Sequence, residues 1–152
     1  MPKTSAGLLM IDRQRRVLLV HPGGPFFKRR DAGVWSIPKG LGEPGEELEA
    51  TARREFKEEL GFDPGDVPLF SLGAIKQGSG KIVHAWAFIG EWNPSRIISS
   101  HFEIEWPPGS GKLQSFPEVD RAEFFDAAAA EEKIIVAQRP LLARAMAWLQ
   151  GA

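Results

Sequence analysis

The sequence predicts one α+β domain spanning residues 1–152, with helices packed on a mixed β-sheet. Several short runs of apolar, often branched residues are typical of strands, and only a few segments have the length and composition of helices. Strands and helices alternate too rarely for an array of purely parallel strands, which favours a mixed sheet. A chain of 152 residues buries one core, and a second full domain is not expected.

The N-terminal part begins with two expected strands and a loop. Residues 6–11 and 17–20 are apolar runs separated by the polar segment 12–16, as in two strands joined by a turn. The second run is apolar at every position, which predicts a central strand covered on both faces. Residues 21–33 contain two prolines, three glycines and three consecutive basic residues, so we expect an irregular loop, followed by a brief extended stretch at 33–38.

The clearest helix of the sequence covers residues 46–60. This segment contains no Gly or Pro, begins with acidic residues that complement the helix dipole, and ends at Gly61. The remaining elements are predicted from alternation and turn residues. We expect strands at 69–75, 81–89, 101–106 and around 124–125, and helices from Ala127 and over 140–149.

Composition and charge exclude several classes of protein. The 19 Lys and Arg residues against 20 Asp and Glu give a net charge of −1, so strong nucleic-acid binding is not expected. The N-terminal apolar run Ala6–Ile11 is too short to span a membrane, and no membrane partner is expected. The absence of cysteine removes disulfides, Cys-ligated metals and thiol nucleophiles. It also fits a reducing compartment, from which we expect a cytoplasmic location.

Three carboxylates gather on one side of the predicted helix. At about 100° per residue, Glu55, Glu58 and Glu59 fall within one arc beside the apolar stripe of the helix. A solvated acidic face with i,i+4 ion pairs is the ordinary interpretation, but Glu55 and Glu59 are a like-charge i,i+4 pair. A hard divalent cation with oxygen ligands would offset this repulsion, and Mg²⁺ held by carboxylates commonly presents phosphate oxygens to a nucleophile.

The same residues carry a resemblance to a known family. The spacing is Gly40, five residues, Glu46, seven residues, and then the run Arg54-Glu55-Phe56-Lys57-Glu58-Glu59-Leu60-Gly61-Phe62. It resembles the signature of the Nudix hydrolases, which cleave nucleoside diphosphates linked to another moiety, and every specified position is filled. The resemblance implies the Nudix fold, an α/β/α sandwich with a mixed β-sheet and a loop–helix–loop catalytic motif.

The resemblance also implies roles for individual residues. The implied ligands of Mg²⁺, for which Mn²⁺ could substitute, are Glu55, Glu58, Glu59 and the carbonyl of Gly40. Arg54 is expected to orient the carboxylates by pairing with Glu46 or Glu55. A metal-activated water would then attack a phosphorus and cleave a P–O–P bridge.

Residues on either side of the signature resemble one subgroup. The Pro38-Lys39-Gly40 run is similar to asymmetrically cleaving dinucleoside tetraphosphate hydrolases, and it would place Lys39 beside the metals. Lys81 resembles a phosphate-contacting lysine, with a hairpin-edge lysine as the alternative. The segment beginning at Glu118 resembles the part of those hydrolases that supplies a fourth carboxylate, acting as base or outer metal ligand. Two departures are that Val119 replaces the usual His and that the chain has no tyrosine for stacking.

Several other residues compete for functional roles. Glu103 and Glu105 share one face of the strand expected at 101–106, so they are rivals to Glu118 as the base or simply a solvent-facing pair. His84 is either a hydrogen-bonded core histidine or a residue that contacts a base. The basic run 28–30 could clamp a distal phosphate or be solvated.

The sequence therefore predicts a Mg²⁺-dependent pyrophosphohydrolase of nucleoside polyphosphates, with a dinucleoside tetraphosphate as the preferred substrate. We expect it to act on small molecules as a monomer or homodimer. The alternative substrates are an oxidised nucleoside triphosphate, an ADP-ribose-type compound and an RNA 5′ end, of which the near-neutral charge disfavours the last. The alternative to an enzyme is a non-catalytic module that senses nucleotides without turnover.

Overall fold

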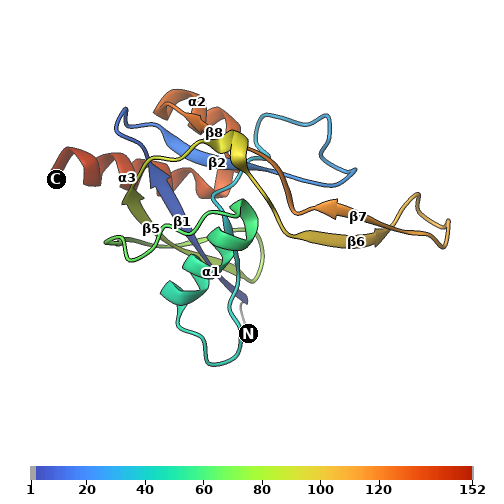
Figure 1. Cartoon of the computed structure of the whole chain (residues 1–152). Helices are drawn as coiled ribbons and strands as arrows, with labels where there is room; N and C mark the ends of the chain where they lie inside the picture. Colours follow the sequence, from blue (N-terminus) through green and yellow to red (C-terminus); the bar gives the residue numbers. More distant parts are fainter. Residues whose placement is uncertain (1–2, 152) are drawn as a thin grey trace.

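The computed structural model describes residues 3–151 and confirms the α+β prediction (Figure 1). The strands are β1 (Lys3–Ile11), β2 (Val17–Pro22), β3 (Lys39–Leu41), β4 (Phe70–Lys76), β5 (Lys81–Ile89), β6 (His101–Glu105), β7 (Leu113–Pro117) and β8 (Val119–Phe125). The helices are α1 (Leu48–Leu60), α2 (Ala127–Lys133) and α3 (Arg139–Gly151), with 3₁₀ turns at Pro94–Arg96 and Val136–Gln138.

The main sheet is mixed, as the sequence predicts. Its strands run in the order β4-β5-β1-β2-β8, with β3 also paired to β1. The β1–β5 pair is parallel along its whole length, and the other pairs are antiparallel. Gly7 of β1 lies opposite Lys39, and a Cβ atom at Gly7 would lie 2.5 Å from the carbonyl oxygen of Pro38. The absence of a side chain there lets β3 reach β1 and fixes the position of Lys39.

Alternating residues of β1 fill two cores, one on each face of the sheet. Leu8 and Met10 pack in the core under α1 together with Phe56, and Leu9 packs in the core under α3 together with Leu141. All five side chains are fully buried. In Figure 1, α1 lies on one side of the sheet and α3 on the other, so the α/β/α sandwich is confirmed.

The hairpin formed by β6 and β7 is a separate two-stranded sheet that projects from the body of the molecule (Figure 1). Its base is attached to the C-terminal end of α1. The N–H groups of Ile98 and Ser100 donate to the carbonyls of Leu60 and Glu58 at 3.0 and 2.9 Å. The carbonyl of Ser100 in turn accepts the N–H of Glu118 at 2.8 Å. One residue thus connects the helix with the start of β8.

Some element boundaries differ from the sequence prediction. The helix begins at Leu48 instead of Glu46, because the Glu46 side chain accepts hydrogen bonds from Thr51 and Arg54 and stays in the preceding turn. The extended stretch at 33–38 contains only isolated bridges at Trp35 and Ser36. The short strands β3 and β7 were not predicted. Among the described residues, no helix has both the length and the apolar character needed to cross a membrane.

Candidate metal and catalytic site

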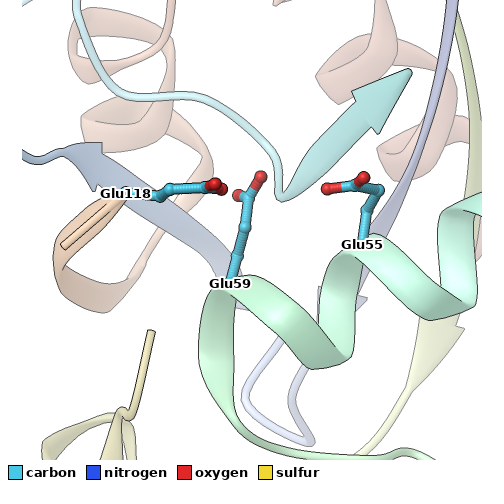
Figure 2. Close-up of side chains that lie close together, drawn as sticks. All are labelled: Glu55, Glu59 and Glu118. Carbon is cyan, nitrogen blue, oxygen red and sulfur yellow. The ribbon is translucent and has the colours of Figure 1, made fainter. Parts of the chain in front are cut away.

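Three carboxylates from two separate elements converge at one end of the sheet. Glu55 and Glu59 project from the same side of α1, and Glu118 approaches from the residue before β8 (Figure 2). One carboxylate oxygen of each lies within 4.8 Å of the others. Glu59 is 8% exposed, Glu55 is half-buried and Glu118 is exposed. The cluster therefore has a buried end at α1 and an open end at Glu118.

Backbone hydrogen bonds hold Glu118 in this position. Its N–H donates to the Ser100 carbonyl at 2.8 Å, and its carbonyl accepts the N–H of Gly23 at 2.9 Å. Ser100 is itself bonded to the carbonyl of Glu58 on α1. The main chain at Glu118 is therefore fixed with respect to the helix that carries the other two carboxylates.

Gly40 forms the wall of the cluster on the β3 side. A Cβ atom at this position would lie 2.1 Å from the carboxyl carbon of Glu55, so only glycine allows that carboxylate to lie against β3. Gly40 and Glu55, which the resemblance implies to be ligands of one metal, are thus neighbours. The role of the Gly40 carbonyl as a ligand stays a prediction.

Arg54 makes both of the ion pairs that the sequence left as alternatives. Its Nε and Nη2 atoms donate to the two carboxylate oxygens of Glu46 at 2.9 and 3.0 Å, and Nη1 donates to Glu55 at 2.9 Å. The hydrogen bonds from Arg54 are the main cause that lowers the pKa of Glu46 to about 2, and Glu46 also raises the pKa of Arg54. Arg54 therefore holds the loop before α1 against the first carboxylate of the cluster.

Glu58 lies at the border of the cluster. Its side chain is 45% exposed, and its carboxylate pairs with Nη1 of Arg54 at 3.3 Å. It is not one of the three residues whose oxygens converge, but its charge contributes to raising the pKa of both Glu55 and Glu118. Its role as a ligand stays a prediction.

The three converging carboxylates all have raised pKa values. Burial is the main cause for each, and repulsion between carboxylates adds to it. The pKa of Glu59 is raised the furthest, because it is buried and faces both Glu55 and Glu118. Such a cluster stores like-charge repulsion at neutral pH, and a bound cation would relieve it.

Of the two lysines expected to contact phosphate, Lys39 lies beside the cluster. Lys39 is half-buried, and burial lowers its pKa, an effect that the charge of Lys81 reinforces and the carboxylates of Glu59 and Glu55 oppose. Lys81 is exposed at the first position of β5. Lys39 is therefore close to the acidic site, and Lys81 lies within electrostatic reach of Lys39. The contact of either lysine with a phosphate stays a prediction.

The rival acidic residues lie elsewhere. Glu103 and Glu105 are exposed on β6, and neither belongs to the group of converging carboxylates. His84 is half-buried, its Nε2 lies 3.1 Å from the hydroxyl of Ser71, and its ring stacks on Trp86 with centroids 4.3 Å apart. The structure thus favours the hydrogen-bonded packing role for His84.

Beside the carboxylates lies a cavity of about 380 Å³ that sequence reasoning missed. Glu59, Glu118 and Lys39 border one part of it. The loop between β2 and β3 contributes Phe27 and Arg30 to the lining. The sequence does contain a signal for this cavity, because Phe27 stands directly before the basic run 28–30. Only the basic residues of the loop, however, suggest a function from sequence.

The donor set fits a hard divalent cation. The converging ligands are carboxylate oxygens, which Mg²⁺ and Mn²⁺ prefer, and a glycine cradle holds Glu55 in place. Additional positive charge would offset the repulsion that raises the pKa values of the cluster. The residues present therefore fit the divalent metal that the resemblance implies.

Comparison with known proteins assigns this geometry to a family. A family model described as the NUDIX domain matches residues 1–145. The chain belongs to the NUDIX domain family. The structure of this NUDIX domain is similar to a C. elegans Ap4A hydrolase in a binary complex, with a TM-score of 0.69, 20% identity, and coverage of 97% of this chain and 99% of the other.

Other relatives are known by their complexes or by curated names. The NUDIX domain of Shewanella oneidensis NrtR complexed with ADP ribose has a TM-score of 0.66 and 15% identity, covering 98% of this chain and 89% of the other. A mitochondrial ADP-ribose pyrophosphatase of Rattus norvegicus is 56% identical over 33 residues, which span 22% of this chain and only 9% of that protein. The solved structures, at 20% and 15% identity, establish the fold alone.

Proposed function

We propose that this NUDIX domain is a metal-dependent pyrophosphohydrolase that cleaves a P–O–P bond of a nucleoside polyphosphate, with a dinucleoside tetraphosphate as its preferred substrate. The observation that carries the proposal is the convergence of Glu55, Glu59 and Glu118 within 4.8 Å, next to a cavity of about 380 Å³. A set of acidic ligands beside a roomy pocket is the arrangement expected of a site for metal-assisted hydrolysis.

Each residue of the cluster has a distinct part in this proposal. The three carboxylates, with Glu58 and the Gly40 carbonyl beside them, would hold Mg²⁺ or Mn²⁺, which when bound supplies Lewis acidity and lowers the pKa of a coordinated water. Arg54 keeps Glu55 in its orientation through the hydrogen bond of 2.9 Å. Glu118, at the open end of the cluster, is our candidate for the base that accepts a proton from water, with Glu55 as the alternative.

The cavity supports the binding of a nucleoside beside the reacting phosphate. Phe27, Val34 and Ile37 give it apolar walls against which a base can pack. Lys39 and Arg30 supply positive charge at its lining, suited to phosphate oxygens. Because Lys81 adds a further cation near Lys39, the site offers several separate positive groups along a phosphate chain. This favours a substrate with four phosphates over a shorter one.

An ADP-ribose-type pyrophosphatase is the second candidate. It is favoured by the match of 33 residues with a rat protein that carries this name. The dinucleoside polyphosphate remains our preferred assignment because ADP-ribose has two phosphates and would leave Lys81 without a role. The cytoplasmic location and the monomeric or dimeric state expected from the sequence stay predictions.

A substrate panel in ¹⁸O-labelled water tests the proposal. We expect diadenosine tetraphosphate to be split asymmetrically into ATP and AMP, faster than ADP-ribose or any deoxynucleoside triphosphate, and we expect a chelator to abolish the reaction. The position of the ¹⁸O label identifies the phosphorus that is attacked. Formation of two ADP molecules, or faster release of pyrophosphate from a triphosphate, would reject the preferred substrate. Tight binding of nucleotides without any turnover would reject the enzyme in favour of a sensing module.

A further inference from the structure

A fully buried histidine lies behind the wall of the cavity. His21, near the end of β2, is 0% exposed. Its Nδ1 lies 2.8 Å from Oδ1 of Asp120, and its Nε2 lies 2.7 Å from the backbone carbonyl oxygen of Arg30. The ring also contacts Trp35 edge-on, with centroids 5.2 Å apart. The imidazole is thus bonded at both nitrogens and packed against an aromatic ring.

Both polar partners of His21 are hydrogen-bond acceptors. A backbone carbonyl has no proton to donate, and an ionised carboxylate has none either. A neutral imidazole carries a single N–H, so one of its two contacts would place lone pairs against lone pairs. Both contacts are favourable only if His21 carries a proton on each nitrogen, and the carboxylate of Asp120 then balances its charge. The side chain of Asp120 is 32% exposed, and its Oδ1 also lies 3.9 Å from Nε of Arg121.

A β-bulge directs Asp120 toward the histidine. In the β2–β8 pairing, His21 lies opposite Arg121 and Pro22 lies opposite Val119, so Asp120 is the extra residue on β8. A bulge of this kind changes the direction of the extra side chain and is frequent next to functional sites. Here it occurs two residues after Glu118, at the strand end that enters the carboxylate cluster.

The other contact of His21 reaches the middle of the loop at residues 23–33. The main chain of Arg30 forms a turn in which its N–H donates to the carbonyl of Phe27 at 3.0 Å. The guanidinium of Arg30 lies over the ring of Phe27, 5.7 Å from its centroid. Both residues line the cavity. A bond that holds the Arg30 carbonyl therefore also fixes the aromatic wall of the cavity.

We propose that His21 is a positioning residue, an imidazolium that clamps the loop carrying Phe27 and Arg30 to the bulge at Asp120 and thereby shapes the substrate cavity. The proposal rests on the proposed function only in taking the cavity as the substrate site. The clamp itself can be tested without turnover, because the two protons of the ring and the order of the loop can be measured without substrate.

Two substitutions separate the clamp from general packing. His21→Phe keeps a ring of similar size but removes both donors, so we expect KM for diadenosine tetraphosphate to rise about tenfold while kcat changes less than about threefold. Asp120→Asn supplies an amide that can donate to Nδ1, so a neutral His21 keeps its Nε2–H bond to Arg30. We therefore expect KM of this variant to stay within about twofold of the wild type. His101→Phe, at an exposed position on β6, is the matched control and should be neutral.

Nitrogen-15 NMR of the histidine ring gives the second readout, on the wild-type protein without substrate. From the two acceptors that face the ring, we expect both ring nitrogens of His21 to carry a proton in the wild type, and one of them to carry none in Asp120→Asn. Amide hydrogen exchange at residues 24–32 should accelerate in His21→Phe and not in His101→Phe. An unprotonated ring nitrogen in the wild type would overturn the proposal, as would a loss confined to kcat in His21→Phe.

These readouts also separate the clamp from the proposed function. If the wild type hydrolyses no nucleotide, the function fails while the NMR and exchange results still decide the clamp. If His21→Phe does not fold, the ring spectra of the wild type and of Asp120→Asn decide it.

Discussion

Two acidic regions of this NUDIX domain contain carboxylates of the same chemistry in very different surroundings. On β6, Glu103 and Glu105 are exposed and stand on a hairpin that projects from the body. At α1, Glu55 and Glu59 meet Glu118 in a cluster where burial and mutual repulsion raise all three pKa values. The difference shows that carboxylates acquire raised pKa values where the fold brings them together and removes water, and that a pair of exposed charges on a strand does not produce this effect.

The largest expected effect comes from removing one buried charge. Glu59→Gln preserves the volume of the side chain but deletes the carboxylate at the centre of the cluster, so activity with saturating Mg²⁺ should fall by about 10²- to 10⁴-fold. Steady-state kinetics measures the loss, and circular dichroism checks that the fold is intact. Glu103→Gln is the matched control and should retain nearly full activity. Retention of more than about a tenth of the activity by Glu59→Gln would remove the distinction between the two regions.

The next largest effect distinguishes between the carboxylates outside α1 that could belong to the site. Glu118→Gln should lower kcat about 10²-fold with little change in KM, since Glu118 reaches the open end of the cluster where a proton can be accepted. Glu105→Gln, on the outward face of β6, should leave both constants near the wild-type values. The opposite ranking would transfer the role of base to the hairpin.

A smaller effect is expected at the glycine that makes room for the cluster. In Gly40→Ala the new methyl group would collide with the carboxylate of Glu55, so activity should fall about tenfold or more because the carboxylate is displaced. Gly42→Ala is the control in the same loop, where the new Cβ would lie 3.1 Å from the Thr51 hydroxyl and needs only a small adjustment. Equal activity of the two variants would show that the position of Glu55 against β3 is not needed.

The helix-borne half of the site could be predicted from sequence because it depends on local geometry. Helical periodicity alone brings Glu55 and Glu59 to one face, and the spacing from Gly40 through Glu46 to Arg54 marks the preceding loop. The strands β1, β2 and β5 could also be predicted from a local signal, which in their case is a continuous run of apolar residues. The start of the helix was placed two residues too early, because the tertiary pairing of Glu46 with Arg54 overrides local propensity.

The other half depends on contacts between residues far apart in the chain. Glu118 reaches the cluster through the hydrogen bonds that join α1, Ser100 and β8, and no pattern in the sequence encodes them. Sequence alone therefore left Glu118 and Glu103 as rivals. The clamp at His21 escaped prediction for the same reason, since its partners Arg30 and Asp120 are 9 and 99 residues away. The short strand β7 was missed because it is stabilised mainly by its pairing with β6.

The smallest effect is a pH dependence of stability in the metal-free protein, and it contrasts the two regions without any substrate. The raised pKa values mean that the folded cluster keeps protons at pH values where the unfolded chain, with an ordinary glutamate value of 4.5, has lost them. Stability in the presence of a chelator should therefore fall as the pH rises above about 4.5, by a few degrees in Tm. Glu46 acts in the opposite direction, but with a folded pKa of about 2 its stabilising effect is complete above pH 4.5 and changes only below that value, so the two trends do not overlap. Glu59→Gln should flatten the slope and raise Tm at pH 7, whereas Glu103→Gln should keep the wild-type slope. Thermal unfolding followed by circular dichroism between about pH 5 and pH 8 measures both, and a slope that Glu59→Gln leaves unchanged would show that the cluster does not carry the stored repulsion assigned to it.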